Sequence, residues 1–227
     1  MLVARREDRL RTLAEEIGNA EVEPCDISER FAVERMAAAV HERHPAVQLL
    51  VNNAGIPGRR GFTAIDPETL ERVLRTNYLG NVWCLRALLA ALEAAGRADV
   101  VNIVSVAGTV AFAPSGPYSA SKHAQLAFSR SVTAELRPRG IHVHTVNPGF
   151  VETEGFPQRE VLRSTISRRL VIEPDAVARA VLHALDRDQR EVFVPRVFRL
   201  ASIAQALVPG LVGRVSSRSG YRPTIQP

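Results

Sequence analysis

The chain has 227 residues, of which 46% are hydrophobic, and this is enough for one domain with a sizeable core. No apolar run approaches the ~18 residues of a membrane-spanning helix. The N-terminus, MLVARREDRL, is too charged for a secretory signal, so we expect a cytoplasmic protein. The sequence pI is about 10.0, but residues 192–227 hold five arginines and no acidic residue, which equals the whole net charge of +5. Because no aromatic-rich basic motif accompanies this tail, the composition argues against nucleic-acid binding.

The two cysteines, Cys25 and Cys84, are far apart and form no CxxC motif. A disulfide framework or a zinc site is therefore not expected. We expect two buried thiols and no metal.

Strand-like and helix-like segments alternate along the chain. In chain order we expect a strand at 2–4, a helix at 7–18, a strand at 20–24, a helix capped by Ser28 and ending near His44, a strand at 47–51, a long helix from Asp66 to about Ala95, a strand at 99–104, a helix at 116–137, a strand at 141–146, a loop-rich stretch at 147–173, a helix at 174–186 and a strand at 191–194. Residues 47–51 are apolar throughout, as strands buried on both faces are.

Repeated strand–helix–strand units predict an α/β fold, a three-layer, doubly wound, Rossmann-like parallel sheet with right-handed crossovers. We expect residues 1–195 to form this domain. Residues 196–227 are expected to be a basic, partly apolar C-terminal extension.

A tyrosine and a lysine carry the strongest chemical signal. Lys122 is the only lysine among 29 basic residues, and Tyr118 precedes it by four positions on an expected helix, so the two share a face. An ammonium group beside a phenol lowers the phenol pKa from ~10 towards neutrality, which makes a general acid/base. Ser105 ends a strand at the carboxyl edge, where α/β sheets place ligands, and can donate to a substrate carbonyl. The alternative is a half-buried tyrosine and a solvated lysine with no shared role.

Four motifs surround these residues in a fixed order. They are Asn52-Asn53-Ala54-Gly55, Asn102-Ile103-Val104-Ser105, Tyr118-Ser119-Ala120-Ser121-Lys122, and Asn147-Pro148-Gly149 followed by Val151 and Thr153. They resemble the NNAG, serine-strand, YxASK and NPGxVxT motifs of the short-chain dehydrogenases/reductases, and the similarity covers about residues 1–195. The resemblance implies a Rossmann-like fold, a nicotinamide cofactor and a carbonyl–alcohol reaction.

The resemblance also implies a role for each matching position. Tyr118 would exchange a proton with the substrate oxygen, Lys122 would lower the tyrosine pKa and bind the nicotinamide ribose, and Ser105 would polarise the carbonyl. Asn77 would hold a water linked to Lys122, with its backbone locally distorting the long helix. The implied cofactor contacts are Arg5, Asp26, Ile27, Asn53, Ala54, Gly55, Tyr118, Lys122, Pro148, Gly149, Val151 and Thr153. Ordinary turn or helix roles remain the alternatives for Asn77, Asp26 and the two turns.

The end of the first strand indicates the form of the cofactor. Enzymes that use NAD place an acidic side chain at the matching point, where it accepts from the ribose 2′-hydroxyl. This chain has Arg5 and Arg6 there instead. Because no carboxylate would repel a 2′-phosphate and Arg5 can pair with it, we expect NADP, with NAD as the alternative. The two arginines can also be simple solvated charge.

One motif of the family is absent. The family opens with a strand and a glycine-rich turn whose amides receive the pyrophosphate, but no glycine precedes Gly18. That strand would lie in the middle of the sheet, so its absence predicts two unpaired inner edges and exposed apolar surface. We expect either a start codon assigned too far downstream or a truncated, inactive product, and the intact catalytic residues favour the first. We expect the chain as written to bind NADP(H) weakly or not at all.

Substrate specificity is expected near residues 106–117 and 150–170. The aromatic and proline residues there predict a mainly apolar pocket; they are Phe112, Pro114, Phe150, Phe156 and Pro157. Four arginines are expected in a solvated lid, with an anionic substrate as the alternative; they are Arg159, Arg163, Arg168 and Arg169.

Residues 198–215 are apolar, with flanking arginines and a break at Pro209-Gly210. We expect internal packing or a homo-oligomer contact there, ahead of peripheral contact with a membrane surface.

The leading functional hypothesis is an NADP-dependent carbonyl reductase or alcohol dehydrogenase acting on a small substrate. An epimerase or dehydratase that keeps the same tyrosine and lysine is a second hypothesis. A non-catalytic binding remnant is the third, and the missing phosphate-binding turn supports it.

Overall fold

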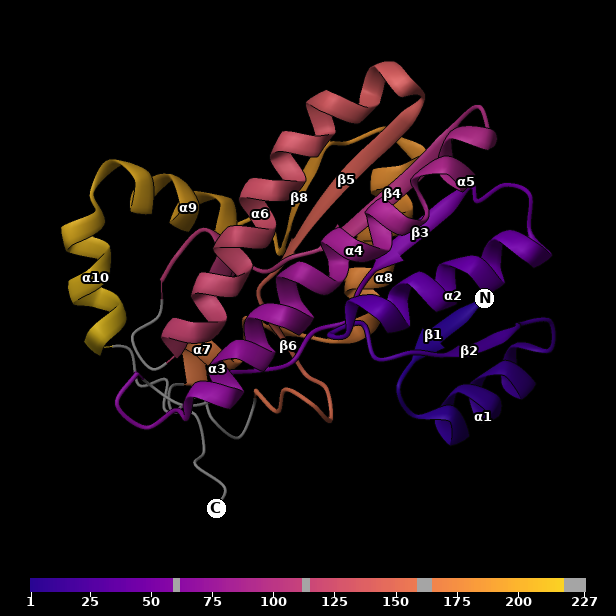
Figure 1. Ribbon diagram of the computed structural model, residues 1–227. Coiled ribbons are helices and arrows are strands. Elements are labelled where there is room, and N and C mark those ends of the chain that lie inside the picture. Colours follow the sequence, from indigo (N-terminus) through magenta and orange to yellow (C-terminus); the bar gives the residue numbers. More distant parts are fainter. Residues whose placement is uncertain (59–61, 112–114, 159–164, 219–227) are drawn as a thin grey trace.

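A parallel β-sheet with helices on both faces organises the molecule (Figure 1). The computed structural model describes residues 1–58, 62–111, 115–158 and 165–218. Its main sheet has four parallel strands in the order β3-β4-β5-β8, with the bounds β3 Leu49–Asn52, β4 Ala98–Ile103, β5 Ile141–Pro148 and β8 Glu191–Val194. This confirms the predicted α/β, Rossmann-like class.

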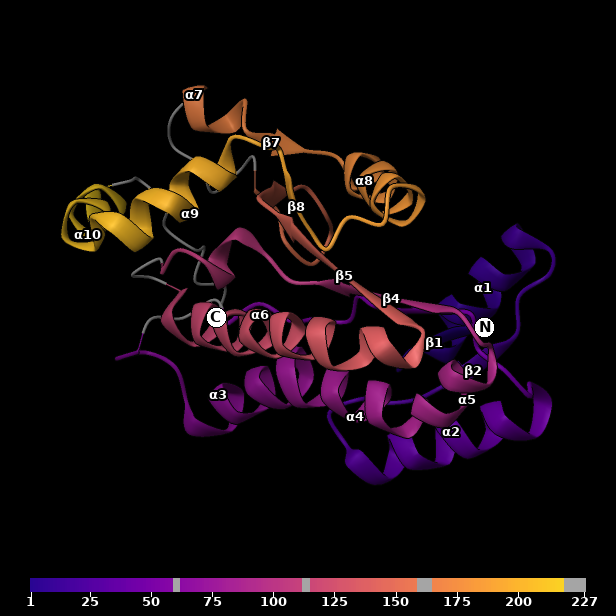
Figure 2. The same ribbon diagram turned by 90° about the horizontal axis from the view of Figure 1, so that it is seen from above.

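Five helices cover one face of the main sheet, and Figure 2 shows them together on the side opposite α8 (Pro174–Asp186). These five are α2 Arg30–Arg43, α3 Pro67–Leu74, α4 Gly80–Ala87, α5 Leu89–Ala94 and α6 Gly116–Leu136. The predicted start of α3 is confirmed, because the Asp66 carboxylate accepts from the Thr69 backbone N–H at 2.7 Å and Pro67 opens the helix.

The first two strands form a separate parallel pair. β1 (Leu2–Ala4) pairs with β2 (Val22–Pro24), and α1 (Glu7–Ile17) connects them and ends at Gly18 with φ 82°. No ladder joins β1 to β3 in the part of the chain that the structure describes. The predicted unpaired inner edges are therefore present.

The strand at 47–51 is not buried as predicted. Leu49 and Val51 in β3 are 47% and 45% exposed, and Val3 in β1 is 38% exposed. These apolar side chains lie on the two strands whose inner edges have no partner. They confirm the exposed apolar surface that the absent strand predicts, whereas the burial inferred from the continuous apolar run is wrong.

Two local predictions also need correction, the cap at Ser28 and the loop-rich stretch at 147–173. Ser28 does not cap α2: the cap position is Glu29, and the Ser28 hydroxyl donates to Asp26 at 2.7 Å. The loop-rich stretch holds three short elements, β6 Phe150–Val151, α7 Thr165–Arg168 and β7 Val171–Ile172. The apolar C-terminal segment forms two helices, α9 (Phe198–Leu207) and α10 (Pro209–Arg218).

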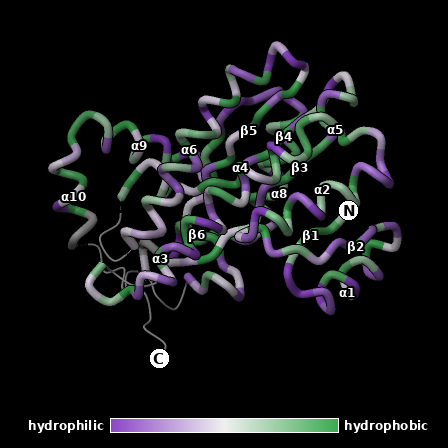
Figure 3. Tube along the Cα trace, in the orientation of Figure 1, coloured by the Kyte–Doolittle hydropathy of each residue, from purple (hydrophilic) through white to green (hydrophobic). Residues whose placement is uncertain are grey.

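The main core lies between the sheet and the five-helix layer. It joins β4 and β5 to α2, α4 and α6 and includes Val33, Leu92, Val100 and Ile141, each of them fully buried. Figure 3 shows this apolar interior along the Cα trace. Cys25 and Cys84 lie in the same cluster as free thiols, and burial raises their pKa values to about 11 and 12, as expected for structural thiols.

Candidate active site

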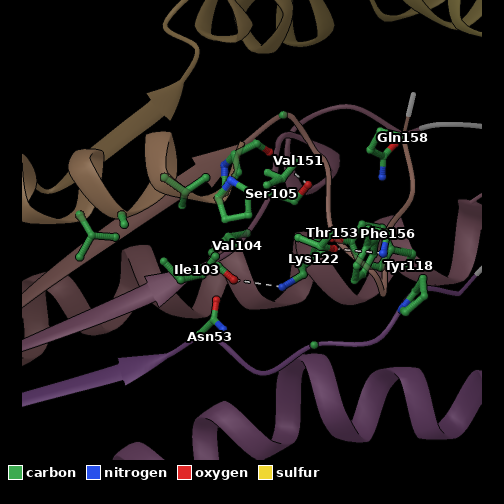
Figure 4. A pocket seen from close by; sticks show the side chains of 18 of the residues that line it. Asn53, Ile103, Val104, Ser105, Tyr118, Lys122, Val151, Thr153, Phe156 and Gln158 are labelled. Carbon is green, nitrogen blue, oxygen red and sulfur yellow. Dashed lines mark hydrogen bonds between the residues drawn. The ribbon is translucent and has the colours of Figure 1, made fainter. Parts of the chain in front are cut away.

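The carboxyl ends of β3, β4 and β5 open into a cavity of about 810 Å³. Nine of the residues expected at the site line it, namely Asn53, Gly55, Ser105, Tyr118, Lys122, Pro148, Gly149, Val151 and Thr153. Figure 4 shows the labelled side chains among them, which come from the segments after the strand ends and from α6; they are Asn53, Ser105, Tyr118, Lys122, Val151 and Thr153. Parallel pairing explains the convergence, because the register Asn52↔Asn102 and Ile103↔Val146 brings three strand ends to one edge.

Lys122 is buried on the cavity wall, with 3% of its surface exposed. Its Nζ donates to the Ile103 backbone oxygen at 3.0 Å, the contact drawn in Figure 4, and to Gln125 Oε1 at 2.7 Å. Burial lowers the Lys122 pKa from 10.5 to about 7. The amine can therefore gain and lose a proton near neutral pH.

Tyr118 lies one helical turn before Lys122 on α6, as the spacing predicts. The Lys122 Nζ is 5.9 Å from the centroid of the Tyr118 ring. The ring also contacts Phe156, with ring centroids 5.8 Å apart. The tyrosine ring is thus close to both an amine and an aromatic side chain that line the same cavity.

Ser105 follows β4 and is buried, with 8% of its surface exposed. Its Oγ accepts from the Ala107 backbone N–H at 3.1 Å and donates to the Pro148 backbone oxygen over a long 3.4 Å. Since that donated bond is weak, the hydroxyl proton is available to an acceptor in the cavity.

Asn77 lies in a π-helical turn, Arg75–Leu79, between α3 and α4, which is the local distortion expected at this residue. Its side-chain oxygen accepts from the Ile56 backbone N–H at 2.7 Å, and its amide donates to Ser121 Oγ at 3.0 Å. Its backbone oxygen accepts from the Asn81 side chain at 2.7 Å. The turn thus ties the loop after β3 to α6, and a water held by Asn77 stays a prediction.

The remaining expected contacts lie away from the cavity wall. Arg5 and Asp26 follow β1 and β2 and approach to 3.7 Å, with 59% and 38% of their side chains exposed. Asp26 also accepts from the Ser28 backbone N–H at 3.0 Å, which is the turn role weighed as its alternative. Ile27 packs in the core against Gly80, and Ala54 does not line the cavity.

Apolar side chains form part of the cavity wall. Phe156 and Pro157 line it as expected, together with Val177 and Val181 of α8. Phe150 instead packs on Phe198 of α9, with ring centroids 5.9 Å apart. The expected Phe112, Pro114, Arg159 and Arg163 lie outside the described residues, and Arg168 and Arg169 are exposed and do not line the cavity.

Three polar residues near the site were not predicted. Gln125 and Asn81 contact Lys122 and Asn77 directly. Gln158 lines the cavity, and its buried Oε1 has no partner in the part of the chain that the structure describes. For Gln125 a signal existed, since it follows Lys122 by three positions on one helix.

The residues at the cavity fit the nicotinamide end of a dinucleotide. Gly55 leaves room beside Lys122: a Cβ there would lie 3.7 Å from Nζ and 3.4 Å from Asn77 Oδ1. The pyrophosphate end is different, because no glycine-rich turn precedes Gly18 in this chain. Metal-binding clusters of His, Cys, Asp or Glu are absent from the described residues.

Comparisons with known proteins agree with this geometry. The family model described as short chain dehydrogenase matches residues 1–161. A putative ketoacyl reductase of Streptomyces coelicolor is 38% identical over 156 residues, which are 66% of this chain and 60% of that relative. A crystal structure of a short-chain dehydrogenase from Streptomyces avermitilis aligns with a TM-score of 0.76 at 28% identity, over 95% of this chain and 86% of that one.

An actinorhodin polyketide ketoreductase, solved with NADPH, aligns with a TM-score of 0.71 at 32% identity, over 80% of this chain and 78% of that one. The family model covers more than half of the chain, and the sheet order and the site residues are in keeping with it. The chain therefore belongs to the short-chain dehydrogenase/reductase family of NAD(P)-dependent oxidoreductases.

Proposed function

We propose that the protein interconverts a small carbonyl compound and its alcohol with NADP(H), and that Tyr118 is the general acid/base. The observation that carries the proposal is the buried Lys122 on the cavity wall, with its Nζ 5.9 Å from the Tyr118 ring and its pKa lowered to about 7. A bound nicotinamide supplies or accepts the hydride at the substrate carbon.

The side chains have separate tasks in this scheme. Ser105 donates its hydroxyl proton to the substrate oxygen in place of the long bond to Pro148. Tyr118 gives its phenolic proton to the same oxygen in reduction and takes it back in oxidation. A charged Lys122 stabilises the phenolate that Tyr118 becomes.

Replacing the tyrosine tests the proposal. Tyr118→Phe keeps the ring on Phe156 but removes the proton donor, so we expect turnover of ketones or aldehydes to fall by roughly 10²–10⁴-fold. The measurement is loss of NADPH absorbance at the highest attainable cofactor concentration. Tyr78→Phe is the matched control, because Tyr78 packs on Phe128 and does not line the cavity. Equal turnover in Tyr118→Phe and the parent would contradict the proposal.

For the cofactor we propose NADP rather than NAD. Arg5 directly follows β1, and its guanidinium is 59% exposed and 3.7 Å from the Asp26 carboxylate. The ketoreductase neighbour and a metagenomic short-chain oxidoreductase at 30% identity were solved with NADPH and NADP. These observations support a 2′-phosphate contact at Arg5.

Arg5→Ala tests the cofactor preference. We expect the Kd for NADP⁺ to rise by about 10-fold or more and the Kd for NAD⁺ to change little, because a hydrogen bond to a charged group contributes about 1.5–3 kcal/mol. The readout is the ratio of the two Kd values from calorimetry, which remains informative when both are weak. Arg6→Ala is the neighbouring control. An unchanged ratio in Arg5→Ala would count against NADP recognition by this arginine.

The wall beside Phe156 and Pro157 favours an apolar substrate. We propose that residues 1–195 form the catalytic unit and that the C-terminal segment, including α9 and α10, serves as a contact surface. The exposed leucines of these two helices support a contact role.

A further inference from the structure

Gln125 lies one turn after Lys122 on α6, and its side chain is 1% exposed. Its Oε1 accepts from the Lys122 amine at 2.7 Å. The second acceptor of that amine is the backbone oxygen of Ile103 at 3.0 Å. Two of the three N–H groups of a charged Lys122 therefore donate hydrogen bonds, and these two bonds fix the direction of the third N–H group.

Packing alone does not explain a glutamine at this position. Its Nε2 is buried and has no partner within the described part of the chain. A buried donor left without a partner costs about 1–3 kcal/mol, and a leucine of similar size would avoid that cost. The bond from Lys122 to Oε1 is the interaction that a leucine would lose.

The surroundings of Lys122 hold few other groups able to act on its charge. Tyr118 faces it from α6, the neutral Asn77 side chain from the π-helical turn, and the backbone of Ile103 from β4. Glu154 also lines the cavity, but its carboxylate is bound by Arg9 at 2.7 Å. Lys122 forms no ion pair with the described residues, which leaves the Gln125 oxygen as its closest side-chain acceptor.

We propose that Gln125 is a positioning residue that holds the Lys122 amine and stabilises its charged form, so that Gln125 sets the pH range in which Tyr118 can act. Only the last step, the effect on Tyr118, rests on the proposed function. An amide oxygen has a partial negative charge, so it offsets part of the cost of burying the ammonium group. A carboxylate in its place would offset more, and an alkyl group none.

Lys122 offers a direct readout because it is the only lysine in the chain. Protein labelled with ¹³Cε-lysine gives one side-chain carbon signal, whose chemical shift reports the charge of this amine against pH. No cofactor or turnover is needed. The parent, Gln125→Leu and Gln125→Glu are titrated under the same conditions, and circular dichroism checks that each is folded.

The two variants should move the titration in opposite directions. We expect Gln125→Leu to lower the Lys122 pKa and Gln125→Glu to raise it, each by about one unit or more, since one unit corresponds to 1.36 kcal/mol. If Gln125→Leu does not fold, the upward shift in Gln125→Glu carries the test. Shifts below about 0.3 unit in every folded variant would overturn the inference.

Ser129→Ala is the matched control. Ser129 lies one turn further along α6, is fully buried and bonds to Asn102 at 2.9 Å and Thr145 at 2.7 Å, away from Lys122. Its loss should weaken the fold and leave the Lys122 titration in place. An equal displacement in Ser129→Ala would mean that any buried lesion moves the titration, and the inference would fail.

The pH profile of turnover separates this inference from the proposed function. If the Gln125 variants shift the NMR titration of Lys122 and the pH profile of turnover in the same direction, the Gln125 inference and the proposed function are both supported. A shifted titration in a protein with no turnover removes the proposed function and keeps the Gln125 contact. If turnover depends on Tyr118 but the Lys122 titration does not move in the Gln125 variants, the proposed function stands and the Gln125 inference fails.

Discussion

Burial of the Lys122 amine lowers the stability of the folded chain. Its pKa falls from 10.5 to about 7 in the folded chain, so between these values the unfolded chain holds a proton that the folded chain lacks. Stability from this group therefore rises with pH across that window, and the full cost applies below pH 7. The amine that the proposed chemistry requires is thus a group that the fold would be more stable without.

Lys122→Met should therefore raise the thermal midpoint while turnover falls. Methionine fills a similar length without a charge, so the gain should be largest near about pH 6 and smallest above about pH 10.5. Melts followed by circular dichroism across this range check the trend. Lys122→Arg keeps the charge, so its thermal midpoint should not rise above that of the parent. A methionine variant that melts below the parent near pH 6 would contradict the argument.

Individual site residues divide into those with a sequence signal and those without one. Ser105, Tyr118 and Lys122 were predicted because their motifs are ordered, and the structure brings them to one cavity. Gln125 and Asn81 were given no role, because each acts by one contact with a motif residue. Helical spacing places each of them near its motif residue but does not show which contact forms, so only the packed structure reveals the hydrogen bond.

At the scale of elements, apolar runs and caps predicted the helices and strands well. The bounds of α8 and β8 match the prediction, because Pro174 opens α8 and β8 is a short, isolated run with Val192, Phe193 and Val194. The long helix expected from Asp66 to Ala95 is instead α3, a π-helical turn, α4 and α5. Residue propensities do not encode that turn; the expected distortion at Asn77 came from the family resemblance.

Asn81 explains how the π-helical turn is stabilised. A wider turn removes a carbonyl from the regular helical ladder, and the Asn81 side chain donates to the Asn77 oxygen at 2.7 Å. The Asn81 Oδ1 is buried without a partner in the described residues. The π-helical turn therefore contains one buried oxygen without a hydrogen bond, and it holds the Asn77 side chain against Ile56 in the loop after β3.

For the whole molecule, the sequence predicted the class of sheet, its interruption and exposed apolar surface beside the gap, whereas the apolar pattern of the strand at 47–51 by itself predicted burial. The same apolar pattern in β3 would be covered on both sides in an unbroken sheet. Here the main sheet ends at β3, and Leu49 and Val51 are half exposed. Burial depends on neighbours that a local pattern does not contain, so the apolar run predicted the strand correctly and its burial wrongly, while the absence of the neighbouring strand predicted the exposure.

The C-terminal helices present a second apolar surface at this scale. Leu200, Leu207 and Leu211 are 66%, 75% and 59% exposed on α9 and α10, whose apolar residues are visible in Figure 3. The only charged residues from 192 to 227 are five arginines. None of the described helices is long and apolar enough to cross a bilayer. The sequence favoured internal packing or a subunit contact over a membrane surface here. Two copies with the same positive charge repel each other, however, so we propose that this apolar surface binds an anionic lipid surface.

We therefore expect the protein to co-sediment with vesicles that contain phosphatidylserine, but not with pure phosphatidylcholine, and to be released by salt. A Leu200→Glu, Leu207→Glu double variant should lose this binding, because it places two carboxylates on the apolar surface of α9. Phe31→Glu, at a 65% exposed site on α2, is the matched control and should still bind. If the parent does not sediment and instead forms a dimer, and the double variant is monomeric, this surface is a subunit contact and the membrane proposal fails.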